Sequence, residues 1–173
     1  MNTRTLLPLA TIFCVLLPSA RAATRTWDGG GANDFWMNAT NWVGDVAPVA
    51  GDDLAFPRGA ARLSNWNNFP AGTSFNSITI SGTGYYLDGA NILLNAGINA
   101  TNTSAGNTVH LPLTLNFNQT ITTSNSGASL SLQTAIDLNG KDLTFAGNGQ
   151  AHVLAVITGA GGLIKTDSGH LSL

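Results

Sequence analysis

The sequence has few charged residues and almost no cysteine. Charged side chains make up 9% of the 173 residues, against about 25% in ordinary soluble domains, and none of the acidic residues is glutamate. The only cysteine is Cys14, which lies in an apolar N-terminal segment. Once that segment is removed no thiol remains, which excludes a disulfide framework, a zinc–thiolate site and a cysteine nucleophile.

The chain also lacks a basic patch and, after its first 22 residues, any convincing helical periodicity. Seven basic residues stand against nine aspartates, so the formal net charge is −2. Loss of Arg4 and Arg21 with the N-terminal segment leaves five against nine, a net charge of −4. This balance does not attract nucleic acid. Polarity comes from Asn, Thr, Ser and Gly, which favour turns and strand faces over helix interiors, so we predict an all-β mature chain.

Residues 1–22 have the pattern of a secretory signal peptide. A short basic start precedes an apolar run at 6–17, which is shorter than the ~20 residues of a membrane-spanning helix. Ala20-Arg21-Ala22 is an A-x-A cleavage signal. We therefore expect cleavage between Ala22 and Ala23 and a secreted or cell-surface location, the alternative being an uncleaved anchor or a buried helix.

The mature chain divides into two regions of different composition. Residues 23–75 contain all four tryptophans, whereas residues 76–173 contain none and have short alternating segments between Gly, Asn and Ser turns. Such alternation predicts strands with one buried face. We expect strands at 77–81, 92–95, 109–115, 120–123, 130–133, 135–138, 143–145, 153–157, 163–166 and 170–173. Strands this short and frequent are typical of a sandwich or of a solenoid, and Asn-Gly turns also occur in hairpins.

The last fifteen residues, 159–173, carry a regular spacing of glycine and leucine. The residues that define this spacing are Gly159, Gly161, Leu163, Lys165, Gly169, Leu171 and Leu173. The segment resembles the autotransporter-associated β-strand repeat, also called the passenger-associated transport repeat, with Asp167 where that family usually has glycine. The resemblance implies an all-β, right-handed parallel β-helix, a β-solenoid. We expect Leu163, Leu171 and Leu173 to point inward or to lie at the end of the stack, and Lys165 to point outward.

The aromatic region 23–75 also resembles the opening of many secreted bacterial proteins with these repeats. The matching residues are Trp27, Gly29, Gly30, Trp36, Asn41, Trp42, Pro48, Asp52, Asp53 and Phe56. Two interpretations of the tryptophans remain open, a sugar-stacking platform and a hydrophobic cap on the first turn of the solenoid. We favour the cap, because terminal repeats need closing and aromatic side chains bury large areas.

No residue pattern predicts a catalytic, cofactor-binding or metal site. Aspartates 28, 52 and 53 offer oxygen ligands for calcium, but turn formation and backbone hydrogen bonding explain them more simply. The three histidines are widely spaced and match no metal-binding motif. Asp137, Lys141 and Asp142 lie close in sequence, but the Asn139-Gly140 corner separates the two carboxylates. We therefore predict a protein that is not an enzyme.

Composition indicates only a secreted β protein, and the resemblance implies its function: a non-catalytic secreted or cell-surface passenger segment that supports export and forms a structural stalk, with a role in adhesion. The alternative is a carbohydrate-binding or glycan-cleaving β-helix module. The partners implied by the resemblance are the export machinery and an outer-membrane barrel (downstream or separate), and surface glycans are the partners that the carbohydrate-binding alternative implies. Because the sequence ends within a repeat, we also expect it to be the N-terminal part of a longer protein, the alternative being a chain that needs a partner. In either case we expect an open last turn that self-associates or frays when the chain is alone.

Overall fold

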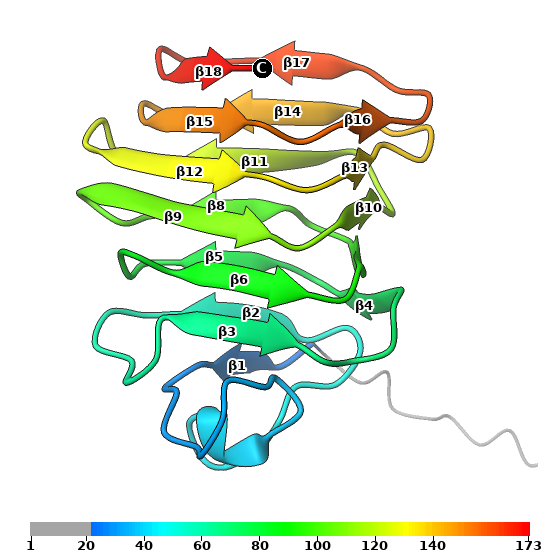
Figure 1. Ribbon diagram of the computed structural model, residues 1–173. Helices are drawn as coiled ribbons and strands as arrows, with labels where there is room; N and C mark the ends of the chain where they lie inside the picture. Colours follow the sequence, from blue (N-terminus) through cyan, green and yellow to red (C-terminus); the bar gives the residue numbers. More distant parts are fainter. Residues whose placement is uncertain (1–21) are drawn as a thin grey trace, which may run out of the picture.

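The computed structural model describes residues 22–173, which form a β-solenoid with almost no helix (Figure 1). The strands are β1 (Thr24–Thr26), β2 (Asp53–Phe56), β3 (Ser64–Asn67), β4 (Thr73–Phe75), β5 (Ile78–Ile80), β6 (Tyr86–Gly89), β7 (Ile92–Leu94), β8 (Ile98–Ala100), β9 (Ala105–His110), β10 (Leu113–Leu115), β11 (Gln119–Thr123), β12 (Ala128–Leu132), β13 (Ile136–Asp137), β14 (Leu143–Ala146), β15 (Gln150–Val153), β16 (Ile157–Thr158), β17 (Leu163–Lys165) and β18 (His170–Ser172). A single 3-10 turn, η1 (Ala39–Asn41), precedes β2. Within this range no helix is long and apolar enough to cross a membrane. The predicted signal peptide, apart from Ala22, lies outside the described residues.

Three sheets form the sides of the coil, and each complete turn contributes one strand to each sheet. The seven-stranded sheet has the order β1-β2-β5-β8-β11-β14-β17, the six-stranded sheet β18-β15-β12-β9-β6-β3 and the five-stranded sheet β16-β13-β10-β7-β4. Neighbouring strands in each sheet are parallel. The chain therefore makes about five turns, which confirms the predicted parallel β-helix over a sandwich or a series of hairpins.

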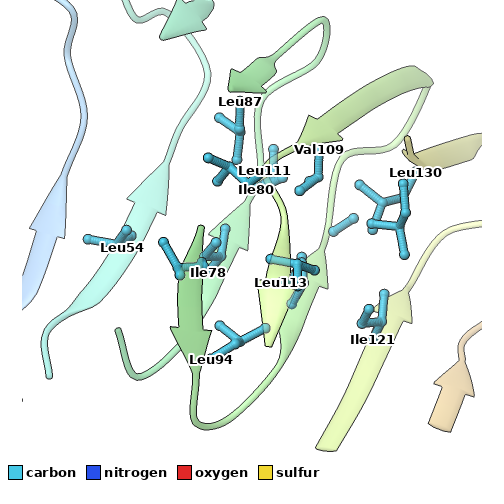
Figure 2. Packing of buried hydrophobic residues seen from close by; sticks show 14 of the residues in the cluster. Leu54, Ile78, Ile80, Leu87, Leu94, Val109, Leu111, Leu113, Ile121 and Leu130 are labelled. Atoms are coloured by element: carbon cyan, nitrogen blue, oxygen red, sulfur yellow. The ribbon is translucent and has the colours of Figure 1, made fainter. Parts of the chain in front are cut away.

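Apolar side chains of successive turns lie above one another inside the coil (Figure 2). In the seven-stranded sheet, Leu54 pairs with Ile78, Ile78 with Ile98, and Ile98 with Ile121. All four side chains are buried. The steps from 54 to 78, from 78 to 98 and from 98 to 121 are 24, 20 and 23 residues, so one turn takes 20 to 24 residues. The alternation along each strand thus becomes a continuous core along the solenoid axis.

Two of the expected strands are each divided by a corner. The segment expected at 109–115 is split between β9 and β10, and the segment expected at 153–157 is split between β15 and β16. Proline at position 112 lacks the N–H that a ladder needs. In the second case Leu154 and Val156 are exposed although apolar. Because residues at these corners are apolar, the hydrophobic pattern alone does not show where one strand ends and the next begins.

The expectation that Lys165 points outward is wrong. Lys165 pairs with Phe145, which pairs with Ile121, and both of these partners are buried. Leu163 and Lys165 are two positions apart on one strand, so they lie on the same face of the sheet. At the last turn, the Lys165 ammonium donates a hydrogen bond to the Asp167 carbonyl at 3.0 Å. Leu163 and Leu173 are exposed in this turn, and Leu171 packs against the core.

Candidate functional site

Three of the four tryptophans form a buried cluster below the first turn. Trp27, Trp36 and Trp42 are fully buried. The rings of Trp27 and Trp42 meet edge to face at 5.2 Å, and Trp36 meets Phe75 in the same way at 5.7 Å. Phe56, also buried, touches all three indoles. The cluster covers the end of the core, as a cap does.

Each of these indoles also has its N–H hydrogen-bonded within the protein. Trp27 Nε1 donates to the Arg62 carbonyl at 2.8 Å, and Trp42 Nε1 donates to the Trp36 carbonyl at 2.7 Å. Trp36 Nε1 donates to Asn65 Oδ1 at 2.7 Å. Neither a ring face nor an N–H of these three residues is available to a sugar. They are therefore not a stacking platform.

Asn41 holds the loop around this cluster in shape. Its side chain is buried. Asn41 Nδ2 donates to the carbonyls of Asn33 and Phe35 at 2.8 and 2.9 Å, and Asn41 Oδ1 accepts from the Gly31 amide at 2.8 Å. The Asn41 carbonyl accepts from the amides of Asp28 and Gly29. A side chain with both donors and an acceptor is needed here, which explains asparagine in the N-terminal pattern.

The other predicted residues of the N-terminal pattern surround this loop. Gly29 has φ +65°, and a Cβ there would lie 2.6 Å from the Arg62 amide nitrogen, which explains the glycine. Pro48 is buried, whereas Gly30 is exposed and donates its amide to Asp28 Oδ1 at 2.9 Å. Asp53 Oδ1 accepts from Asn76 Nδ2 at 2.7 Å. These contacts give the carboxylates of Asp28 and Asp53 turn-forming and bridging roles within the fold.

Asp52 joins the start of the described chain to the first turn. Its carboxylate accepts from the Ala23 amide at 3.1 Å, from Arg25 Nε at 3.0 Å and from the Val49 amide at 3.0 Å. The Arg25 contact is also an ion pair. Burial of the Asp52 carboxyl raises its pKa, but the hydrogen bonds from Val49, Arg25 and Ala23 outweigh this effect, so the pKa lies below its ordinary value of 3.8.

We expect the substitution Asp52→Asn to destabilise the fold at neutral pH by about 1.5–3 kcal/mol, the usual contribution of hydrogen bonds to a charged group. The pKa is lower in the folded chain than in the unfolded chain, so the charged form stabilises the fold above about pH 4. This stabilisation is lost as the pH falls through the folded-state pKa. Urea denaturation at pH 7, 5, 4 and 3 should show the two proteins converging at low pH. The exposed Asp45→Asn control should stay close to wild type, and a pH-independent loss in Asp52→Asn would contradict the assignment.

The glycines of the C-terminal repeat lie where one turn touches the turn below it. A Cβ on Gly161 would lie 2.0 Å from the Lys141 carbonyl oxygen, and a Cβ on Gly159 would lie 2.5 Å from Asp137 Oδ1. A Cβ on Gly169 would lie 2.4 Å from the carbonyl oxygens of Gly147 and Gly149. At Gly161 and Gly169 the close atoms belong to backbone, so no side chain fits and successive backbones require the glycine. At Gly159 the nearest atom is on a side chain, and the φ of +80° is what favours glycine there.

Asp137 and Asp142, the two carboxylates considered for catalysis, each accept a hydrogen bond from a backbone amide. Asp137 Oδ1 accepts from the Asn139 amide at 2.9 Å, and Asp142 Oδ1 accepts from the Gly162 amide at 2.8 Å. Both bonds are to backbone groups at the corners of the coil. Among residues 22–173, no group of three or more His, Cys, Asp or Glu side chains is arranged to hold a metal ion.

Comparison with known proteins gives no relative for this chain. No family model matches it, and no curated protein or solved structure matches it at a significant level.

The sequence did not indicate a second group of residues, on the outer face of the six-stranded sheet. Trp66 pairs with Phe35 on one side and with Asp88 on the other, and Asp88 pairs with His110. Tyr86 lies beside this row, with its ring stacked on His110 at 5.6 Å. We call Phe35, Trp66, Tyr86, Asp88 and His110 the aromatic strip. Its β-strands, β3, β6 and β9, lie one above another in Figure 1.

Proposed function

We propose that the chain is a non-catalytic, exported β-solenoid segment that supports export and forms a structural stalk at the bacterial cell surface. The observation that carries the proposal is the continuous core, which runs through parallel turns from the aromatic cap to the last strands. Each turn contacts only its neighbours, so such a chain folds turn by turn and adds length with each repeat. The resemblance of 159–173 to the autotransporter-associated repeat and the signal-peptide pattern of 1–22 support the same proposal.

The environment of Ala23 fits the predicted cleavage site. Cleavage between Ala22 and Ala23 turns the Ala23 nitrogen into an α-ammonium group, which is charged at neutral pH. That nitrogen lies 3.1 Å from the buried carboxylate of Asp52. The new ammonium group therefore forms beside a carboxylate that other hydrogen bonds already hold in place. This contact attaches the N-terminus of the mature chain to the first turn of the stalk.

We expect the chain recovered from its native host to begin at Ala23 and to lie outside the cytoplasm. The test is mass spectrometry of the N-terminal peptide from fractionated cells, using full-length protein with a C-terminal epitope tag. Surface exposure is measured by proteolytic removal of the tag from intact cells. A variant with Ala20→Leu and Ala22→Leu, which destroys the A-x-A signal, should lose the Ala23 terminus. Recovery of intact protein with Met1 from the cytoplasm would contradict the proposal.

A further inference from the structure

Trp66 differs from the other three tryptophans in its exposure to solvent and in the hydrogen bonding of its indole N–H. Its side chain is 47% exposed, whereas Trp27, Trp36 and Trp42 are fully buried. Each buried indole donates its N–H within the protein, but no partner for Trp66 Nε1 occurs in the described part of the chain. A large ring and a free N–H are thus presented together on an outer sheet face, although tryptophan usually buries its ring.

The aromatic strip forms a straight row along the axis of the solenoid. Phe35, Trp66, Asp88 and His110 lie at successive register positions. Three steps between parallel strands, at about 4.8 Å each, give the row a length of ~14 Å. Phe35 is 44% exposed and Tyr86 is 36% exposed. The surface is longer than one pyranose ring and presents aromatic side chains at more than one point along its length.

Polar groups of the aromatic strip remain available between the rings. Asp88 Oδ1 is occupied by the Gly89 amide at 2.6 Å and by His110 Nδ1 at 3.0 Å. Asp88 Oδ2, His110 Nε2 and the Tyr86 hydroxyl have no hydrogen-bond partner among residues 22–173. The one carboxylate of the strip lies 3.0 Å from the His110 imidazole, and the strip contains no lysine or arginine. Donors and acceptors alternate with ring faces on this surface.

We infer that the aromatic strip is a binding site for a neutral, linear glycan of pyranose units. The face of an aromatic ring carries negative potential, which suits the C–H bonds on the face of a sugar ring. The hydroxyl groups at the edge of the sugar need the donors and acceptors that Trp66, Tyr86, Asp88 and His110 present. A purely apolar partner would leave these groups buried and unpaired, at a cost in binding. An acidic glycan would find no lysine or arginine on the strip and would meet the Asp88 carboxylate.

This inference goes beyond the stalk function and does not depend on it, because binding is a property of the folded surface. The experiment titrates the purified chain with neutral hexasaccharides, namely cellohexaose, laminarihexaose, xylohexaose and mannohexaose. Tryptophan fluorescence and calorimetry measure binding. Trp66 is the one tryptophan that a ligand on the strip can reach, so binding should shift the emission to shorter wavelength. Polygalacturonic acid fragments of similar length test the preference for a neutral ligand.

The variants Trp66→Ala and Tyr86→Ala should each weaken binding by about tenfold or more, as expected for loss of one aromatic anchor. Two variants serve as controls outside the strip. Phe117→Ala removes a ring that is 58% exposed in the turn between β10 and β11, and Asn99→Ala changes the groove on the seven-stranded sheet. Both should bind like wild type, and all four variants should keep the circular dichroism and melting temperature of the wild-type fold.

Three results would overturn the inference. The first is that none of the four neutral hexasaccharides binds, and the second is that the strip variants bind as well as the two controls. The third is that light scattering shows a dimer which Trp66→Ala dissolves, because the strip would then be an interface between two copies. Failure of export in the native host would count against the stalk function alone, because glycan binding is measured on purified protein.

Discussion

Gly97→Ala should destabilise the solenoid by about 4 kcal/mol or more, the range of exceptional single substitutions. Gly97 immediately precedes β8, and a Cβ there would lie 2.1 Å from the Thr120 carbonyl oxygen in the next turn. That oxygen belongs to backbone, which cannot move aside as a side chain does. The two turns must separate to admit the methyl group, which breaks the parallel ladder between β8 and β11.

Gly140→Ala is the matched control. Gly140 has φ +75° and Gly97 has φ +92°, so alanine is conformationally strained at both positions, but no atom lies within 4 Å of a Cβ on Gly140. We expect about 1–2 kcal/mol for the strain alone. Guanidinium denaturation followed by circular dichroism measures both variants. Equal losses in the two variants would show that close approach of the turns is not what requires glycine at position 97.

The sequence predicts several strands of the second half well, because most of their inward positions are apolar and most of their outward positions are polar. The segments at 120–123 and 143–145 correspond closely to β11 and β14, and Ile121 and Phe145 are buried as alternation requires. Alternation alone does not distinguish parallel from antiparallel pairing, since both bury every second residue. The resemblance to a solenoid repeat supplied that choice.

β3 could not be predicted, because its pattern is the reverse of the usual one. Asn65 and Asn67 point inward and are buried, whereas Trp66 points outward. The two asparagines are tolerated inside because their amides are hydrogen-bonded: Asn65 accepts from Trp36 Nε1, and Asn67 donates to the Ala90 carbonyl at 2.8 Å. These partners come from distant parts of the chain. Hydrophobicity read locally would bury Trp66 and expose the asparagines.

The same difficulty applies to the candidate sites. The four tryptophans all lie in one region of the sequence, and no local signal separates the three that form the cap from the one on the aromatic strip. The strip itself joins residues from 35 to 110, which become neighbours only through the stacking of turns. Its row depends on register, and register depends on the lengths of the intervening corners, which differ from turn to turn.

Trp36→Ala should destabilise the fold by about 3–5 kcal/mol, whereas Trp66→Ala should change stability by no more than about 0.5 kcal/mol. Trp36 is fully buried and meets Phe56 and Phe75 at 5.8 and 5.7 Å. Its loss leaves a cavity at the end of the core and removes the donor to the buried Asn65 Oδ1. Trp66 leaves no cavity, because nearly half of its side chain already faces solvent.

The strands that lose hydrogen-exchange protection distinguish a residue of the cap from an ordinary core residue. Each turn of a solenoid depends mainly on its neighbours, so the loss of Trp36 should reduce hydrogen-exchange protection first in β2, β3 and β4, which supply its contacts, and least in β14 and β15. Urea denaturation gives the size of the loss, and hydrogen exchange gives its position along the stack. A uniform loss of protection in all turns would mean that the solenoid unfolds as one unit. Equal destabilisation by Trp36→Ala and Trp66→Ala would show that the three buried indoles are not what closes the core.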